Sequence, residues 1–183
     1  MIGRRGLIAG AGAAVALGYL GAMVANGARP VQRQHVRSEA NGVLTIPPER
    51  ILRVELRRDD ETLALRRDGE GRWLRPDGTT IDTAAGRRIG TAIQMMHRSG
   101  PVREMTAAEL AGVDTTPFAL ERPRIVATLW AEGDAPALTA RFGGRNPEDF
   151  LQYMRIDGDP RLFLMSRFIG EEWVGAMDAL TGR

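Results

Sequence analysis

The chain of 183 residues contains no cysteine and no lysine. The absence of cysteine excludes disulfide cross-links, thiolate catalysis and cysteine-based metal sites, and it is compatible with an oxidising compartment. Because lysine is absent, all 25 basic residues are arginine, a side chain suited to phosphate and carboxylate recognition. The accompanying abundance of alanine and glycine favours a simpler explanation, which is the codon usage of a GC-rich genome.

Aromatic and histidine residues are also scarce. Aromatic residues make up 5% of the chain, and the formal net charge is only +2. The arginines alternate with acidic residues along the expected strands and form no patch in the sequence, so nucleic-acid binding is not expected. The two histidines, His35 and His97, lack carboxylates at metal-ligand spacing, so no zinc site is predicted.

The common catalytic motifs are missing as well. There is no G-x-S-x-G motif, and Ser38, Ser99 and Ser166 lie in linker, loop and helix-cap contexts, which argues against a hydrolase triad. Residues 10–15 resemble a dinucleotide-binding loop only superficially, since no strand precedes them. The sequence therefore predicts a protein that is not an enzyme, with no cofactor, no metal and no identifiable small-molecule substrate.

One long apolar run is present, at residues 6–25, and it directly follows Arg4 and Arg5. About 20 helical residues, with a rise of about 1.5 Å each, cover the hydrocarbon core of a bilayer, which is about 30 Å thick. We therefore predict a single transmembrane helix over residues 6–25. A soluble helix that is apolar on every face is disfavoured, because this small chain cannot supply a core to cover it.

A cleaved signal peptide is the main alternative for the same residues. Arg4 and Arg5 would form its basic region, and paired arginines before a mild apolar segment also resemble a twin-arginine signal. However, the apolar run is longer than the usual ~7–15 residues. The triplets ending at Ala25 and Ala28 each lack one of the two small residues that cleavage requires, whereas the triplet ending at Gly27 is acceptable. We favour the membrane anchor.

Small residues share one face of this helix. In lipid, helices associate where small residues let their backbones approach closely. A segment so rich in glycine and alanine also forms such a pattern by chance, and this alternative stays open. The predicted helix-packing interface consists of Gly6, Gly10, Ala14, Gly18, Gly21 and Ala22.

The charges that flank the helix predict its orientation. Arg4 and Arg5 favour a cytoplasmic N-terminus, although three arginines just beyond the helix weaken this bias. The polar segment that follows contains proline and glycine without a sustained period, as expected of a linker. The predicted organisation is a cytoplasmic N-terminus (1–5), a transmembrane helix in the bacterial inner membrane (6–25), a periplasmic linker (26–48) and a periplasmic domain (49–183).

The domain shows both strand and helix periodicity. Alternating apolar residues predict strands at 51–58, 62–66, 72–74, 125–130, 137–142, 151–156 and 161–165. Apolar residues spaced three and four apart predict helices at 83–97 and 167–181, with Asp82 and Ser166 as N-caps. A capping box from Thr106 to Glu109 predicts a further one-turn helix. This order indicates an α+β fold with a mostly antiparallel sheet and two main helices.

A pattern is formed by Trp73, residues 118–123, Gly143-Gly144 and residues 153–158. It resembles that of a bacterial family, the domain-of-unknown-function family 4340. In this family an opening strand pair closes on a tryptophan and is followed by a helix. A Tyr-Gly-Leu-x-x-Pro segment, a Gly-rich turn, a Tyr-x-Arg-x-x-Gly hairpin and a terminal helix then follow. The residues named above are the counterparts in this chain.

The resemblance spans about residues 50–180, and the chain departs from it at Phe118 and Ala119, where the family tends to have tyrosine and glycine. It implies an exported, often membrane-tethered domain, and some members accompany ABC transporters of the gliding-motility type. The resemblance supports the expected architecture and implies no catalytic residues.

These observations predict a non-catalytic accessory or structural subunit of an inner-membrane protein complex, in contact with an integral membrane protein complex and with membrane lipid. Its predicted docking residues are Trp130, Tyr153, Arg155 and Trp173, because arginine and tryptophan are enriched at binding hot spots. Tyr153 and Arg155 could instead bind an anion, but the favoured interpretation is that they form one face of the sheet with Arg155 in water. Trp173 fits a core position equally well.

The alternative is a periplasmic binding module for a solute or glycan, which serves an ABC-type transporter and is exported by a cleaved signal peptide. A concave, aromatic-lined pocket would favour it.

Overall fold

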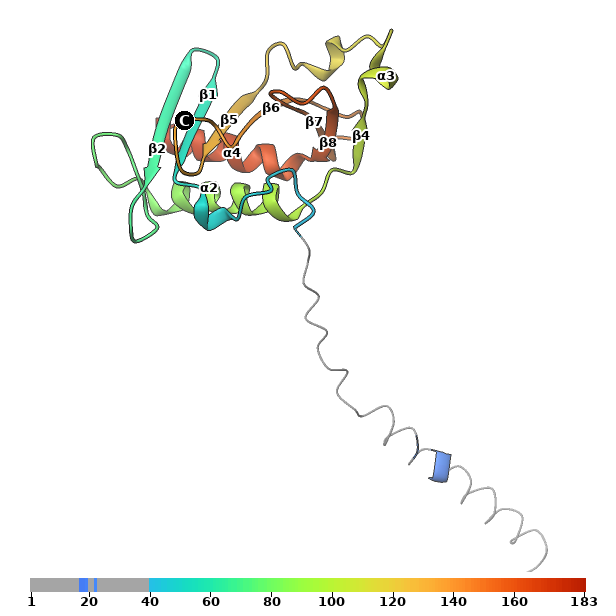
Figure 1. The fold of residues 1–183 in the computed structure, drawn as a ribbon, viewed down its shortest axis with the longest axis horizontal. Coiled ribbons are helices and arrows are strands. Elements are labelled where there is room, and N and C mark those ends of the chain that lie inside the picture. The colour runs from blue at the N-terminus through green and yellow to red at the C-terminus, as the bar shows by residue number, and fades with distance from the viewer. Residues whose placement is uncertain (1–16, 20–21, 23–39) are drawn as a thin grey trace, which may run out of the picture. The chain divides into compact units, whose positions relative to one another are not determined.

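An antiparallel sheet of eight strands dominates the computed structural model, which describes residues 17–19, 22 and 40–183 (Figure 1). The strand order is β3-β2-β1-β5-β6-β7-β8-β4, and each neighbouring pair is antiparallel. The predicted α+β class is therefore confirmed. The strands are β1 (Arg53–Arg58), β2 (Glu61–Arg67), β3 (Trp73–Leu74), β4 (Arg103–Met105), β5 (Ile125–Trp130), β6 (Leu138–Arg145), β7 (Leu151–Ile156) and β8 (Leu162–Ser166).

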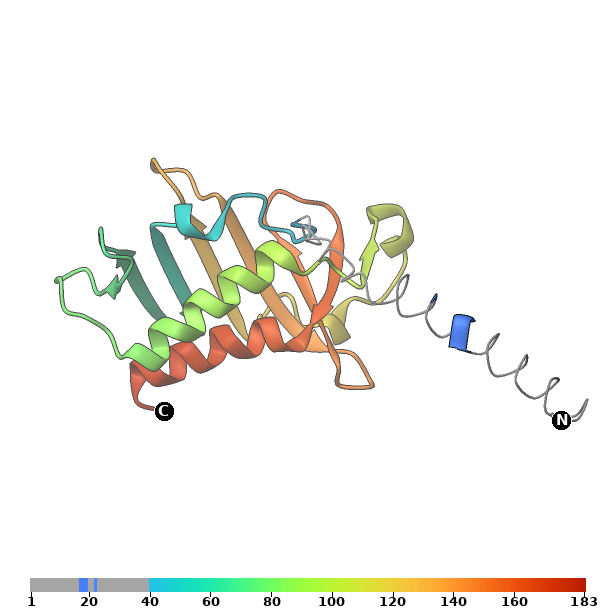
Figure 2. The same cartoon turned by 90° about the horizontal axis from the view of Figure 1, so that it is seen from below.

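Two long helices, α2 (Thr83–Arg98) and α4 (Arg167–Thr181), cover one face of this sheet (Figure 2). The Asp82 side chain accepts hydrogen bonds from two N–H groups in the first turn of α2, as its N-cap position predicts. Gly182, with φ of +75°, ends α4. Both predicted helices are confirmed. Their apolar stripes face the sheet and are buried.

Shorter helical elements lie in the connections. The one-turn helix α3 (Ala107–Leu110) begins with the predicted capping box of Thr106 and Glu109. Two 3₁₀ turns, η1 (Pro48–Arg50) and η2 (Thr116–Phe118), were not predicted. Neither has helical periodicity, because each is a single turn of three residues that contains a proline.

The core lies between the two helices and the sheet. Alternate residues of the central strands point into it and are buried, and α2 and α4 add their own apolar stripes. The strand periodicity therefore identified most buried positions correctly, since successive side chains of a strand point to opposite faces. Leu52 was expected on the buried face with Val54 and Leu56, but it is 39% exposed. The largest fully buried side chains include Trp173, Phe142, Phe163, Ile89 and Met154.

The structure differs from the prediction at the end of the linker. Leu44 is 1% exposed, and the N–H groups of Gly42 and Leu44 donate to the carbonyls of His97 and Met96 at the end of α2. A Cβ at position 42 would overlap this helix end, so the close approach requires glycine. The last predicted linker residues therefore pack against the domain.

The predicted transmembrane span is described only in part. Residues 17–19 and Ala22 are helical, and Gly6, Gly10, Ala14 and Gly21 of the predicted helix-packing interface lie outside the described residues. No helix within the described part of the chain is both long and apolar enough to cross a bilayer. The anchor at residues 6–25 stays a prediction.

Candidate functional site

Three of the four predicted docking residues lie on the face of the sheet opposite the helices, which we call the open face. The strand register places Trp130, Tyr153 and Arg155 there, and each is half-buried. Trp173 does not lie on the open face. It is a residue of α4, its side chain is 0% exposed, and it belongs to the hydrophobic core. Its prediction as a docking residue is corrected, since the apolar stripe of α4 faces the sheet.

Arginines from three strands lie in one row across the open face. Arg57 of β1 is opposite Val126, which is opposite Arg141 of β6, which in turn is opposite Arg155 of β7. Directly opposite side chains are about 4.5–5.5 Å apart at Cβ. The sequence indicated no arginine patch, but the register of strands far apart in the chain assembles this row.

Arg141 is neutralised within the row. Its Nε and Nη2 donate to the two carboxylate oxygens of Asp157 at 2.6 and 2.9 Å. This bidentate hydrogen bonding from Arg141 lowers the pKa of Asp157 below its usual value. The pair also reduces the repulsion expected between Arg141 and its neighbour Arg155.

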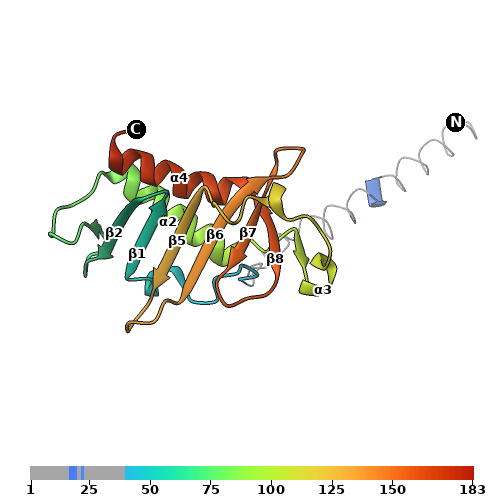
Figure 3. The same cartoon turned by 90° about the horizontal axis from the view of Figure 1, so that it is seen from above.

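The residues 115–122, which we call the crossing segment, pass over the open face before the chain enters β5 (Figure 3). The ring of Phe118 packs on that of Tyr153, with centroids 4.2 Å apart. A Cβ at Gly143 of β6 would overlap the Phe118 carbonyl oxygen. Glycine is therefore required at 143, and the crossing segment lies directly against the strand.

Ala119 has a left-handed backbone conformation, with φ of +51°. Residues other than glycine, asparagine and aspartate adopt this region at a cost of about 1–2 kcal/mol. The packing of Phe118 on Tyr153 holds the turn in spite of this cost.

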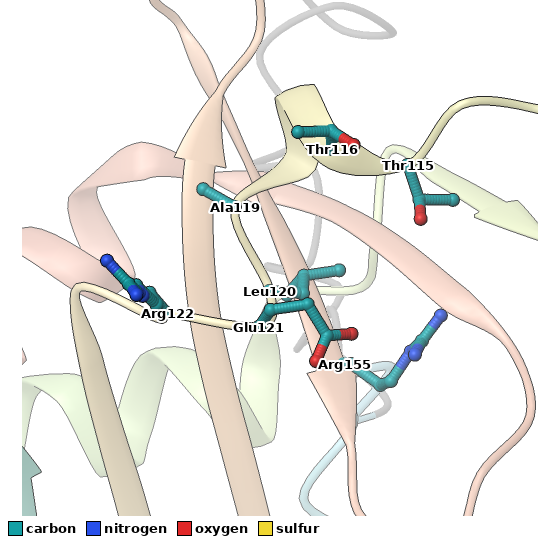
Figure 4. A pocket seen from close by; sticks show the side chains of 7 residues that line it. All are labelled: Thr115, Thr116, Ala119, Leu120, Glu121, Arg122 and Arg155. Atoms are coloured by element: carbon teal, nitrogen blue, oxygen red, sulfur yellow. The ribbon is translucent and has the colours of Figure 1, made fainter.

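A cleft of about 330 Å³ lies between the crossing segment and β7, and we call it the Arg155 cleft (Figure 4). Leu120 is its buried apolar residue, and the other lining side chains are small or polar. The cleft therefore does not have the aromatic lining that would have favoured a binding module. Its lining residues are Thr115, Thr116, Ala119, Leu120, Glu121, Arg122 and Arg155.

Arg155 differs from the other half-buried arginines of residues 40–183. Its Nε is buried without a partner, as are those of Arg58, Arg145 and Arg167. Unlike them, Arg155 forms no other side-chain hydrogen bond or ion pair with a described residue. Each of the others donates at least one hydrogen bond to a carboxylate or a backbone carbonyl. These are Arg58, Arg67, Arg75, Arg141, Arg145 and Arg167.

A second hollow of about 560 Å³ adjoins the cleft on the other side of Glu121 and Arg122. It is lined mainly by charged residues, including Arg57, Asp59 and Arg141. Within the described residues, no group of histidine, aspartate or glutamate side chains could hold a metal ion. The hollow is therefore a charged surface depression next to the arginine row.

Trp130 lies at the far end of the open face from the cleft. The guanidinium of Arg53 lies 5.2 Å from its ring centroid, and its Nε1–H donates to the carbonyl of Asp134 at 3.2 Å. These contacts fix the indole while leaving part of it exposed. Part of the Trp130 side chain is therefore accessible, and its docking role stays a prediction.

Within residues 40–183, two exposed aromatic side chains were not singled out by the sequence analysis. Phe150, in the loop before β7, is 72% exposed, and Phe168, in the first turn of α4, is 54% exposed. The backbone N–H of Arg167 donates to the Phe150 carbonyl, so the two segments are adjacent. In the sequence, Phe150 directly follows the polar stretch 146–149, and this position indicated that its side chain would be exposed.

No protein-family model matches the chain, and neither does any curated protein or solved structure. The resemblance to domain-of-unknown-function family 4340 therefore stays a prediction. The candidate site consists of the arginine row, Trp130 and the Arg155 cleft, all on the open face.

Proposed function

We propose that this protein is a non-catalytic accessory subunit of an inner-membrane protein complex and that its domain docks on a partner through the open face. The observation that carries the proposal is the asymmetry of the sheet. Both long helices cover one face, whereas the face that bears the arginine row and Trp130 has no helical layer over β2, β1 and β5 in the described structure.

The charges of the open face favour a partner protein with an acidic surface. Arg57 and Arg66 are exposed there and form no ion pair within the described residues. Arginines that remain free of internal partners can form bidentate hydrogen bonds with carboxylates of another protein. Trp130, held by Arg53, supplies the kind of rigid aromatic side chain that interfaces favour.

The second part of the proposal is the anchor, which rests on the sequence alone. A transmembrane helix at residues 6–25 would place the domain in the periplasm, and its small-residue face would pack against a helix of an integral membrane partner. Two weak attachments on one chain strengthen each other through a high effective concentration. The subunit would then stay associated with its complex even where each contact is weak.

Co-purification from native membranes tests the docking surface. The full-length protein, tagged at its C-terminus, is extracted in mild detergent, and the proteins that accompany it are quantified. Wild type is expected to retain a stoichiometric partner, and the double variant Arg57→Glu, Arg66→Glu is expected to lose it. The matched control is Arg87→Glu, Arg98→Glu, which reverses two exposed arginines of α2 that have no ion pair within the described residues.

Equal partner recovery in all three proteins would refute docking through the open face. The anchor is tested separately by Gly10→Ile and Gly18→Ile, which are expected to reduce the size of the detergent-extracted complex. N-terminal sequencing of the purified protein completes the test. A chain that begins after residue 25 and is found in the soluble fraction would refute the anchor and favour the exported binding module.

A further inference from the structure

We propose that the Arg155 cleft binds a small zwitterionic amino acid, with the ligand carboxylate on the Arg155 guanidinium and the ligand ammonium on the Glu121 carboxylate. This proposal does not depend on docking through the open face, because the residues that define the ligand site are not those that define the docking test. It gives a specific site and ligand class to the anion binding by Arg155 that the sequence analysis left open.

The carboxylate end of the site follows from the surroundings of Arg155. A guanidinium that is partly removed from water without a counter-ion is energetically unfavourable. The other half-buried arginines of the described domain are compensated internally, whereas Arg155 is not. Arg155 lines the cleft, and a guanidinium whose Nε is buried can still offer its two Nη groups to the two oxygens of a carboxylate.

The ammonium end follows from Glu121. Its exposed carboxylate lines both this cleft and the second hollow, where it interacts electrostatically with Arg141, but it forms no hydrogen bond or ion pair within 4.0 Å with a described residue. Arg155 and Glu121 lie close together in Figure 4, yet no ion pair within 4.0 Å joins them. Two opposite charges that share a cleft without pairing are complementary to a ligand that carries both charges.

Glu121 also excludes a more highly charged anion. A phosphate dianion on Arg155 would lie near the Glu121 carboxylate and be repelled by it. The side chain of Arg122 points away from Arg155 in Figure 4, so it does not cancel this repulsion at the same point. The charge pattern therefore favours a molecule with no net charge over phosphate.

The size and the walls of the cleft limit the ligand side chain. A volume of about 330 Å³ is at the small end of the range for ligand pockets, about 300–1,000 Å³. Leu120 and Ala119 provide the apolar wall, and none of the described lining residues is aromatic. The hydroxyl groups of Thr115 and Thr116 lie at the exposed rim. This lining suits a short aliphatic side chain.

The cleft is formed before any ligand arrives. The packing of Phe118 on Tyr153 and the close approach to Gly143 hold the crossing segment against the sheet. A preformed site avoids the free-energy cost of ordering a loop on binding. Weak but specific binding of a small molecule is therefore physically reasonable here.

Equilibrium dialysis of the full-length protein in detergent with labelled L-alanine tests the proposal. Wild type is expected to bind L-alanine saturably, with acetate, methylamine and inorganic phosphate as poor competitors. Arg155→Gln is expected to weaken binding about tenfold or more, and Glu121→Gln about three- to tenfold, as expected for hydrogen bonds between charged groups. The matched control Arg98→Gln, an exposed arginine of α2, is expected to leave binding unchanged within about twofold.

Each contrary outcome overturns the proposal. Absence of saturable L-alanine binding to wild type refutes the site. Acetate that competes as well as L-alanine refutes the role of Glu121, and phosphate that competes better refutes the ligand class. An equal loss of L-alanine binding in Arg98→Gln would show a general effect of surface charge and would also refute the site.

The variants keep the test decisive. Because Glu121 is exposed, Glu121→Gln still tests the site if Arg155→Gln fails to fold. Arg57→Glu, Arg66→Glu leaves the cleft lining intact, so loss of docking and loss of ligand binding are distinguishable.

Discussion

The two faces of the sheet differ in what covers their side chains. On the covered face, Val54, Leu129, Phe142 and Met154 are buried against α2 and α4. On the open face, their immediate neighbours along the same strands include Arg53, Arg141 and the partly exposed Tyr153. Because successive side chains of a strand point in opposite directions, one strand contributes both to the core and to the surface.

This difference separates stability from recognition. Substitutions on the covered face remove apolar burial, which is the dominant favourable contribution to the free energy of folding. Substitutions on the open face change mainly charge and hydrogen bonding, which contribute little to stability where they are exposed. The following predictions test whether the two faces are as independent as the structure indicates.

Trp173→Ala should produce the largest effect and would damage the covered face. Its indole is fully buried, and its Nε1 has no hydrogen-bond partner in the described structure, so the loss is one of packing. We expect the free energy of unfolding to fall by about 3–5 kcal/mol. Chemical denaturation of the purified protein measures this change. Phe150→Ala, at an exposed aromatic residue, is the control and should stay within about 0.5 kcal/mol of wild type. If Trp173→Ala remained stable but no longer bound the partner protein, the predicted docking role of Trp173 would be supported instead.

Gly143→Ala tests the place where the open face is covered by the crossing segment. The added Cβ would overlap the Phe118 carbonyl oxygen, so the segment must shift. We expect a loss of about 1–3 kcal/mol in the free energy of unfolding, together with weaker ligand binding in the Arg155 cleft. Gly69→Ala is the matched control, because no atom lies within 4 Å of its added Cβ. Unchanged stability and binding in Gly143→Ala would show that the segment is not held as described.

Ala119→Gly should act in the opposite direction. Glycine adopts the left-handed conformation of residue 119 without the penalty that alanine incurs, although it gains more freedom in the unfolded chain. We expect a net stabilisation of about 0.5–1 kcal/mol, seen as a higher Tm. Ala64→Gly, in the middle of β2, should instead lower the Tm. A lower Tm for Ala119→Gly would argue against the left-handed turn.

The ion pair of Arg141 and Asp157 should give the smallest effect. The pKa of Asp157 is lowered in the folded protein, so the pair contributes stability above the unfolded value of about 3.9 and loses it as the pH falls through the folded value. Since both side chains are partly exposed, screening limits the contribution to about 0.2–1 kcal/mol. Denaturation of wild type and Asp157→Asn at pH 7 and pH 3 measures it. The difference between the two proteins should shrink at pH 3, and a constant difference would contradict the assignment.

Local patterns predicted most of the elements. The alternation in β1 and β2, the Asp82 cap of α2 and the capping box of Thr106 and Glu109 depend on neighbouring residues, so they were recognisable without tertiary information. The strand β4 was missed because three residues show no period. It forms only because Arg103–Met105 meet β8 at the edge of the sheet.

The candidate site was less predictable. Tyr153 and Arg155 were identified as a same-face pair, but nothing local showed that Arg155 would have no partner in the described structure or that the crossing segment would form a cleft over it. Trp173 could be assigned to core or surface, and only the packing of α4 on the sheet decided between them.

The amino-acid sequence by itself indicated the main strands and helices of the domain, because periodicity, caps and turn residues act over a few positions. It did not indicate β4 or the last residues of β6. It also determined the absence of cysteine chemistry. The tertiary structure alone decided that Arg57, Arg141 and Arg155 share a row, that Trp173 is buried and that residues 115–122 lie over β7. These features depend on pairing between distant segments, where a shift of one residue in register would turn every side chain of a strand to the opposite face.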